Sequence, residues 1–143
     1  MIHNLSQTDT LLFATAVATS ATQTANLDCK GADWATIRIA CLAEVNTNAI
    51  GPTFRLSESD DTVVTNFATI TADRAGTDGF LASAAVVRYD VDLRKRKRYL
   101  RLTVLPGTAT NDGVTVSAIA TLSRLEQTPS AHTNITSNIT VVT

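Results

Sequence analysis

The sequence predicts an all-β protein: a jelly-roll-like, two-sheet β-sandwich of about eight strands, with extended N- and C-terminal arms. β-branched residues, which favour strands, occur in runs such as 62–65 and 140–143. Apolar and polar residues alternate along 34–42, 96–105 and 114–124, which is the period of a half-buried strand. Turn residues separate these segments at roughly regular spacing, a pattern typical of sandwiches and barrels. An immunoglobulin-like sandwich is the alternative architecture.

The length and charge indicate one domain. The chain has 143 residues, a formal net charge of -1 and 17% charged residues. A chain of this size can bury about two thirds of its unfolded surface, so it can form a single core. No apolar run approaches the roughly 18 residues that a membrane-spanning helix needs, so we expect no membrane partner. We divide the chain into an N-terminal arm (1–10), a β-sandwich domain (11–126) and a C-terminal arm or final strand (127–143).

In the first half of the chain, strands are predicted at 11–19, 34–42, 53–57 and 62–69. The segment 34–42 has the clearest alternation, with Ile37, Ile39 and Cys41 on one face and Trp34, Thr36, Arg38 and Ala40 on the other. We expect turns at 20–33 and 45–52, where Asp, Asn, Gly and Pro gather. The acidic stretch 57–61 is predicted to be a solvated turn, with a cation site at Glu58, Asp60 and Asp61 as the weaker hypothesis.

In the second half, strands are predicted at 80–89, 96–105, 114–124 and 138–143, the first of them with a short helical turn at its start. In 114–124 one face is predicted to hold Val114, Val116, Ala118, Ala120 and Leu122. The last seventeen residues, 127–143, contain no charged side chain. Ile139 and Val141 can therefore add a strand to a sheet edge of another subunit. The alternative is a final strand within the chain's own sheet.

Cys29 and Cys41 leave two hypotheses open. They are either buried thiols in a reducing compartment or a disulfide between neighbouring strands, and the spacing alone does not decide between them. Residues 11–18 have the apolar character of a signal-peptide core. Residues 1–10 contain no Lys or Arg, however, so we expect no secretory signal.

A run of basic residues is the most unusual feature of the sequence. Six of the twelve basic residues lie close together, and the rest of the chain has 6 basic against 13 acidic residues, a charge of -7. The six are Arg94, Lys95, Arg96, Lys97, Arg98 and Arg101. The run can contact acidic side chains of a protein partner, nucleic acid, or solvent at a strand edge. Nucleic acid is the least favoured, because the net charge is slightly negative and only Tyr99 interleaves the run. Asp90 and Asp92 can also pair with the run locally.

The sequence contains no motif for catalysis, a cofactor or a metal. The two histidines, His3 and His132, have no neighbouring residues at metal-ligand spacing. Neither a nucleophile elbow nor a glycine-rich phosphate loop is present. We therefore expect a protein that is not an enzyme and that needs no cofactor.

Two stretches resemble small structural proteins of tailed-phage virions. They are LLFATAVATSATQTA, from residue 11, and VVRYDVDLRKRKRYLRLTVLP, from residue 86. The chain is most similar to capsid decoration (cement) proteins, and similar also to small tail and head–tail connector components. The resemblance implies β-sandwich subunits that bind the outer capsid as homodimers or homotrimers and clamp neighbouring major capsid proteins together without catalysis. It places the protein on the virion after synthesis in the host cytoplasm.

For a cement protein, the partner-contact residues implied here are the arginines of the basic run, together with the arms 1–10 and 127–143. A receptor- or carbohydrate-binding module is a rival class, but aromatic residues make up only 5% of the chain. A β-sandwich hydrolase is another, and the scarcity of histidine argues against it. Ring-shaped assemblies would favour a tail component, whereas dimers or trimers would favour a cement protein.

Overall fold

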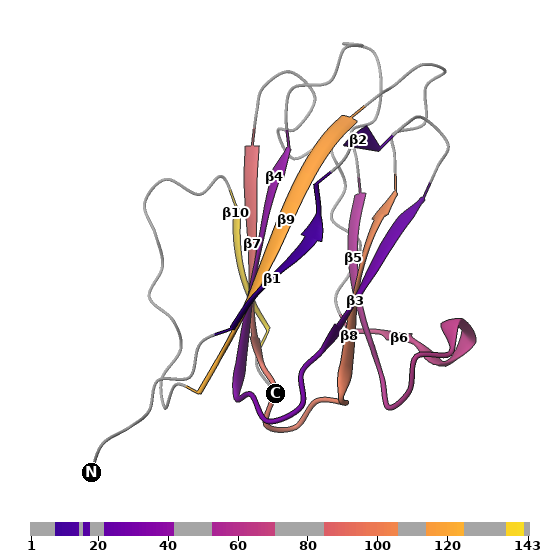
Figure 1. Ribbon diagram of the computed structural model, residues 1–143, viewed down its shortest axis with the longest axis vertical. Helices are drawn as coiled ribbons and strands as arrows, with labels where there is room; N and C mark the ends of the chain where they lie inside the picture. Colours follow the sequence, from indigo (N-terminus) through magenta and orange to yellow (C-terminus); the bar gives the residue numbers. More distant parts are fainter. Residues whose placement is uncertain are drawn as a thin grey trace.

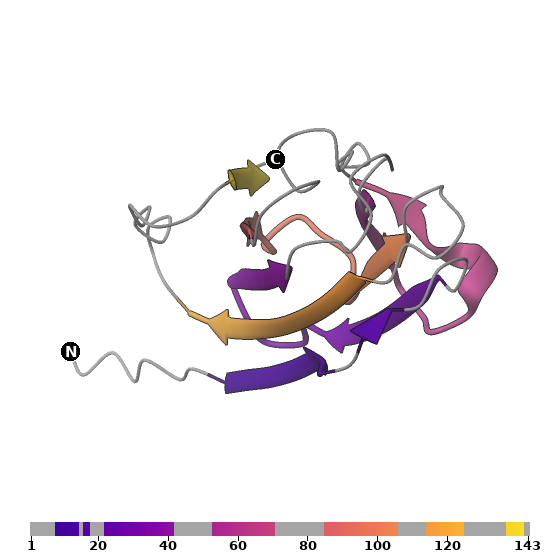
Figure 2. The ribbon, with the colours of Figure 1, turned by 90° about the horizontal axis from the view of Figure 1, so that it is seen from above.

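The computed structural model describes residues 8–14, 16–17, 22–41, 53–70, 85–105, 114–124 and 137–141. These residues form two β-sheets that face each other across one core (Figure 1). The two-sheet, all-β sandwich predicted from the sequence is therefore confirmed. Figure 2 shows the two layers from above, with the strands of each sheet curving around the core.

The larger sheet contains six strands in the described part of the chain. Its order is β1 (Thr8–Phe13), β9 (Val114–Ser123), β4 (Trp34–Cys41), β7 (Ala85–Asp92) and β10 (Ser137–Val141), and β2 (Ala16–Val17) also pairs with β9. The smaller sheet contains four, in the order β3 (Gln23–Asp28), β8 (Tyr99–Leu105), β5 (Thr53–Ser59) and β6 (Ala68–Thr69). A short 3-10 helix, η1 (Val64–Asn66), lies between β5 and β6.

The pairing is that of a jelly roll. When β2 and β10 are set aside, the strands pair from the two ends of the chain inward. The pairs are β1 with β9, β3 with β8, β4 with β7 and β5 with β6. All four pairs are antiparallel, as in one long hairpin folded over to make two sheets. β10 is an addition to this set, because it pairs in parallel with β7 at the sheet edge.

The inner faces of the two sheets form the core. Ile37 and Ile39 of β4 and Ala118 of β9 face inward and are at most 1% exposed. Across the sandwich, Leu56 and Leu102 lie side by side in the register of β5 and β8 and are equally buried. The Tyr89 hydroxyl donates to the Phe54 carbonyl oxygen over 3.4 Å, which links the two sheets and satisfies a buried polar group.

The clearest alternating segments are strands of almost the predicted length. β4, β8 and β9 begin at Trp34, Tyr99 and Val114, and the faces predicted for 34–42 and 114–124 are the ones found. β7 ends at Asp92, three residues beyond the predicted end at 89. Residues 80–84, where a helical turn was predicted, lie outside the described residues.

Residues 23–28 were predicted to be a turn, and this prediction was wrong. They form β3, an edge strand that pairs with β8 over its whole length. Its inner face holds only Ala25 and Leu27 as apolar side chains, and Thr24, Asn26 and Asp28 are exposed. An edge strand with one half-buried face has few apolar residues, so its pattern resembles that of a polar turn.

The strand predicted at 62–69 is also wrong for most of its length. Val64–Asn66 is a 3-10 turn, and only Ala68–Thr69 is strand. The carboxylate of Asp61 accepts hydrogen bonds from the Val63 backbone N–H (2.9 Å) and the Asn66 side-chain amide (2.8 Å). Such side-chain bonds to a neighbouring backbone compete with strand pairing, despite the β-branched composition.

The predicted arms differ from the structure at both ends. β1 begins at Thr8, three residues before the strand start predicted at residue 11, and ends at Phe13 rather than at residue 19. β10 pairs with β7 of the same chain, which is the second of the two alternatives for the C-terminal segment. Residues 1–7, 127–136 and 142–143 of the predicted arms lie outside the described part.

Cys29 and Cys41 are buried and are not joined by a disulfide. Burial raises the pKa of the Cys29 thiol to about 12, so this thiol stays protonated near neutral pH. This outcome agrees with the hypothesis of buried thiols rather than a disulfide. Separately, the described residues include no helix long and apolar enough to cross a membrane.

Candidate functional site

The basic run lies at one end of the sandwich. The β3–β4, β5–β6 and β7–β8 turns meet there, at the lower end of the molecule in Figure 1. We call residues 28–33, 58–61 and 92–98 the charged end. The three turns meet because β3, β5 and β7 all end at this end of the sandwich, and the strand that follows each turn runs back in the opposite direction.

Arg94 pairs with the aspartate two residues before it. Its Nε donates to Asp92 Oδ1 over 2.9 Å, its Nη2 bonds the other carboxylate oxygen, and its backbone N–H donates to Oδ1 over 3.1 Å. The guanidinium lies 5.8 Å from the centre of the Trp34 ring. The expectation that Asp92 can pair locally with the run is therefore confirmed. Asp90, in contrast, pairs with Arg88, which is outside the run.

Arg96 and Lys97 pair with acidic residues at the end of β5 and directly after it. Arg96 lies 3.6 Å from the carboxylate of Glu58, and Lys97 lies 3.5 Å from that of Asp60. The Lys97 backbone N–H also donates to Glu58 over 3.3 Å. The prediction of a solvated turn at 57–61 was therefore wrong for 57–59, which continue β5 and include Glu58, an ion-pair partner of the basic run. Asp60, beyond the strand, is largely exposed as predicted.

Arg98 connects the β7–β8 turn to the end of β3. Its Nε and Nη2 donate to the two oxygens of Asp28 over 3.0 and 2.7 Å, in the bidentate geometry that arginine forms with carboxylates. These hydrogen bonds lower the pKa of Asp28, and Asp28 in turn raises the pKa of Arg98. Both side chains are nearly half exposed, so solvent screens this pair and we expect it to contribute little to stability.

Arg101 is mostly buried and binds its own chain. Its Nε donates to Asn26 Oδ1 over 2.8 Å and its Nη1 to the Val64 carbonyl oxygen over 3.3 Å. The guanidinium lies 3.7 Å from the centre of the Phe67 ring. Arg101 therefore holds η1 against the outer face of the smaller sheet and is 7% exposed.

Lys95 is the remaining member of the run. It is exposed, and it forms no ion pair with the residues that the structure describes. The structure thus brings five of the six predicted basic residues to the charged end, whereas Arg101 is buried on the outer face of the smaller sheet. Four of the five, Arg94, Arg96, Lys97 and Arg98, are paired with acidic residues of the same chain.

The other two predicted contact residues lie elsewhere. Ile139 and Val141 pair in the register of β10 with Tyr89 and Val91 of β7. Among the described strands, β10 is the last one at this side of the larger sheet. The parallel register places Val141 beside Val91, one residue before Asp92, so β10 ends next to the charged end but adds no charge to it.

A buried ion pair on the outer face of the larger sheet was missed from the sequence. Arg88 and Asp90 are each 1% exposed, and Arg88 Nε lies 2.9 Å from Asp90 Oδ2. The Thr36 hydroxyl donates to Asp90 Oδ1 over 2.7 Å. The signal was present in the segment 86–92, where polar residues alternate with core residues, but alternation normally indicates a solvated outer face.

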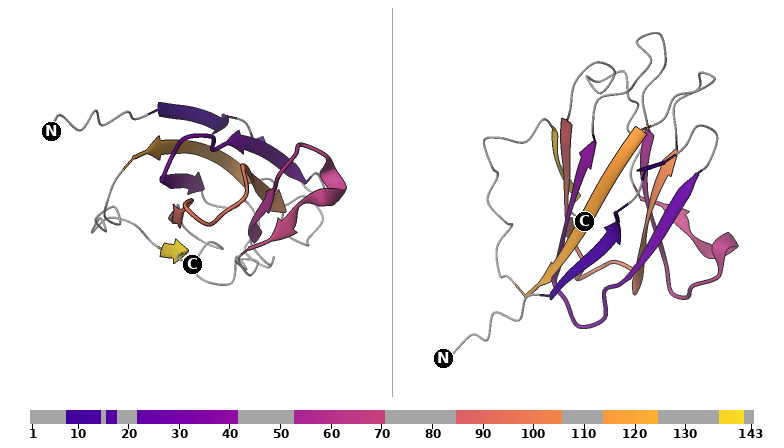
Figure 3. Two further views of the ribbon diagram at one scale, coloured as in Figure 1. Left: turned by 90° about the horizontal axis from the view of Figure 1, so that it is seen from below. Right: turned by 45° about the horizontal axis from the view of Figure 1, so that its top comes forward.

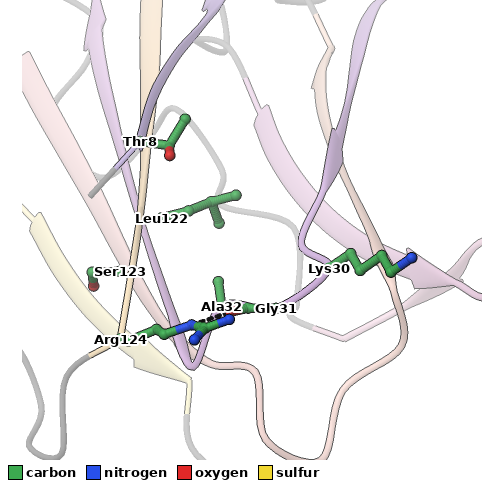
Figure 4. A pocket seen from close by; sticks show the side chains of 7 residues that line it. All are labelled: Thr8, Lys30, Gly31, Ala32, Leu122, Ser123 and Arg124. Atoms are coloured by element: carbon green, nitrogen blue, oxygen red, sulfur yellow. Dashed lines mark hydrogen bonds between the residues drawn. The ribbon is translucent and has the colours of Figure 1, made fainter. Parts of the chain in front are cut away.

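A shallow depression of about 150 Å³ lies beside the charged end (Figure 4). It is lined by Thr8, Lys30, Gly31, Ala32, Leu122, Ser123 and Arg124. Arg124 Nε donates to the Gly31 carbonyl oxygen over 2.6 Å. Gly31 has a φ of 80°, which other residues adopt at a cost, so glycine suits this turn. The volume is sufficient for a few water molecules.

The charged end makes the stability of the protein sensitive to acid. The hydrogen bonds from Arg94 hold the pKa of Asp92 at about 2, below its usual 3.8. A lowered carboxyl pKa adds stability above pH 4 that is lost as the pH falls towards 2. We expect Asp92 to contribute about 1–2 kcal/mol of this loss, reduced by the solvent around Arg94.

Denaturant unfolding of the wild type and of Asp92→Asn at pH 2, 3, 4 and 7 measures this contribution. The wild type should lose more stability than the variant between pH 4 and pH 2, while the control Asp60→Asn should follow the wild type. Parallel pH curves for the wild type and Asp92→Asn would contradict the assignment.

No protein-family model and no curated protein matches the chain. Within the described residues, no group of three or more His, Cys, Asp or Glu side chains is arranged to hold a metal ion.

Proposed function

We propose that the protein is a virion structural protein that binds the outer surface of a phage capsid and cements neighbouring major capsid proteins. It acts without catalysis, as a homodimer or homotrimer on the virion, after synthesis in the host cytoplasm. The jelly roll is compatible with this role, since viral capsid domains often use it, but a fold alone does not define a function.

The observation that supports the proposal best is the edge formed by β10. Natural sheets protect their edges with charged residues, prolines or bulges. The opposite edge of the same sheet has Asp9 and an irregularity in register between Leu11 and Phe13. β10 (Ser137–Val141) has no charge and no proline. Among the described residues, no strand pairs with the outer side of β10, so this edge can accept an extended segment of a capsid protein as a further strand.

The basic run has two roles in this proposal. The arginines with partners in the same chain hold the turns at the charged end in a fixed arrangement. Lys95, which is exposed, is the member available to an acidic residue of the capsid. A single exposed charge affects the rate of association and its salt dependence more than the final affinity. Neutralisation of the neighbouring arginines also supports a protein partner over nucleic acid, whose binding needs several uncompensated positive charges.

Co-sedimentation with shells assembled from major capsid protein tests the role of the edge. We compare the wild type with Asn138→Lys/Thr140→Lys, which places charges on β10. The matched control is Thr22→Lys/Thr24→Lys, at and beside the exposed edge strand β3 of the other sheet. The β10 variant should bind about tenfold more weakly or worse, because edge charges oppose strand addition. The control should bind like the wild type.

Equal binding by both double variants would contradict strand addition at β10. Absence of wild-type binding to shells would contradict the whole proposal. A melting temperature for each variant close to that of the wild type ensures that the comparison concerns binding rather than folding. A tail or head–tail connector component, the nearest alternative function, predicts binding to tail or neck assemblies and not to shells.

A further inference from the structure

The four large apolar side chains that are exposed in the described part of the chain form two pairs. Leu11 is 61% exposed and Ile119 is 44% exposed, and they are directly opposite one another on β1 and β9. Val63 and Val64, at the start of η1, are 54% and 72% exposed. Single exposed apolar residues are common on protein surfaces, whereas adjacent ones often mark a contact.

The two pairs lie on opposite sides of the molecule. Ala118 and Ala120, on either side of Ile119, are in the core, so Ile119 lies on the outer face of the larger sheet. η1 projects from the smaller sheet on the side away from β1 and β9 (Figure 3). We call Leu11 and Ile119 the aliphatic patch, and residues 62–66 the valine knob.

The valine knob is held in one conformation by its own chain. At its base, the Asp61 carboxylate accepts hydrogen bonds from Val63 N–H and from the Asn66 amide. On its inner side, Arg101 donates to the Val64 carbonyl oxygen. A contact that is already ordered loses less conformational entropy on binding than a flexible loop does. Arg101, which was predicted to be a contact residue, therefore positions the knob.

The charges around the two surfaces are complementary. Arg38 is exposed and is directly opposite Ile119 in the register of β4 and β9, so it borders the aliphatic patch. Arg38 has no ion-pair partner among the residues that are described. Beside the knob, the Asp60 side chain is 76% exposed. Its only ion pair with the described residues is the one with Lys97, at 3.5 Å. Opposite charges at the rim of an apolar contact fix its orientation.

From these observations we infer that the valine knob of one copy of the chain binds the aliphatic patch of a second copy, with Asp60 facing Arg38. Because the two surfaces lie on opposite sides of the sandwich, two copies cannot make both contacts with each other. The contact is therefore head-to-tail, and such a contact either continues into an open filament or closes into a ring of three or more subunits. We infer closure: a ring of three is the homotrimer of the proposed function, whereas a larger ring would favour a tail component. Each small aliphatic side chain contributes little binding energy. The fraction of assembled protein should therefore depend on the protein concentration.

Two variants that block one surface each give the most specific test. Val64→Glu removes the knob and leaves the patch, while Ile119→Glu removes the patch and leaves the knob. Each variant alone should be monomeric by light scattering at concentrations where the wild type is a ring, with its subunit affinity lowered about 30-fold or more. An equimolar mixture has one intact knob and one intact patch per pair, so it should form a one-to-one dimer that grows no further.

Control variants introduce the same charge away from both surfaces. Thr115→Glu lies on the exposed face of β9 and Thr24→Glu on the exposed face of β3, and both should assemble like the wild type. For the charge pair, Arg38→Glu and Asp60→Lys should each weaken the ring, and the double variant should restore it. A monomeric wild type, assembly by either blocking variant alone, or a mixture that stays monomeric would overturn the inference.

This assembly forms in the free protein, so its test is independent of attachment to shells. If the ring forms and shells are not bound, the proposed function fails and the inference stands. If shells are bound by a protein that never forms the ring, the inference fails and the proposed function stands.

Discussion

Asp90→Ala is expected to lower the free energy of unfolding by about 3–5 kcal/mol. The substitution removes the carboxylate that accepts hydrogen bonds from Nε and Nη2 of Arg88, over 3.0 and 2.9 Å. The arginine is 1% exposed, so its charge stays buried after the carboxylate is lost. Urea unfolding at pH 7, followed by circular dichroism, gives the change in free energy directly.

Two further variants separate the ion pair from the packing around it. Thr36→Val removes one hydrogen-bond donor to Asp90 and should cost about 1 kcal/mol. The double variant Arg88→Met/Asp90→Leu replaces the pair by apolar side chains and should recover most of the stability lost in Asp90→Ala. A loss below 1 kcal/mol for Asp90→Ala would show that the pair is accessible to water.

Leu102→Ala is expected to destabilise the protein by about 2–5 kcal/mol. Leu102 is 1% exposed at the centre of the smaller sheet, where it is in register with Leu56 on one side and Ala25 on the other. Removing its side chain leaves a cavity between the sheets that neighbouring strands cannot close. The melting temperature should fall by about 3 °C for each kcal/mol lost.

The matched control at this position is Leu102→Met, which conserves volume and should cost less than about 1.5 kcal/mol. If alanine and methionine produced equal, small effects, then the two sheets would not form a single close-packed core. Arg98→Ala, in the exposed turn before β8, should change stability far less than Leu102→Ala does.

The parts of the fold that could be predicted are those where one face of a strand is buried and the other is not. β4 and β9 satisfy this condition, and their faces were assigned correctly from alternation alone. β7 was predicted at about the right place, but its outer face is buried as well. The ion pair between Arg88 and Asp90 neutralises the two charges that are buried there. Alternation of polar and apolar residues cannot distinguish a solvated outer face from one that contains a buried ion pair.

The segments that were predicted wrongly depend on contacts outside themselves. Residues 62–69 have strand composition, yet the side chain of Asp61 organises them as a turn. β3 becomes a strand because β8 offers it a complete set of pairing partners, and its own composition favours a turn. Secondary-structure propensity describes each segment alone, so a prediction based on it missed both the turn at 62–66 and the strand β3.

The clustering of basic residues at the candidate site could be predicted from the sequence, whereas most of the ion pairs that these residues form could not. The six basic residues of the run are adjacent in the sequence, so their clustering was visible. Asp92, the partner of Arg94, is adjacent and was predicted, but the other partners are distant: Asp28 lies 70 positions from Arg98, and Glu58 lies 39 positions from Lys97. Only the topology of the sandwich brings these turns together. The basic run therefore appeared to be an open, positively charged surface, whereas most of it is neutralised within the chain.

Cementing is tested most directly by the temperature at which capsid shells come apart, measured by scanning calorimetry with and without saturating protein. A protein that binds intact shells across neighbouring capsid subunits must stabilise the assembled state. We expect the disruption temperature of the shells to rise by about 5 °C or more, in proportion to occupancy, because many weak contacts act together on one shell. Saturated binding with an unchanged disruption temperature would contradict cementing and would leave a protein that only decorates the shell.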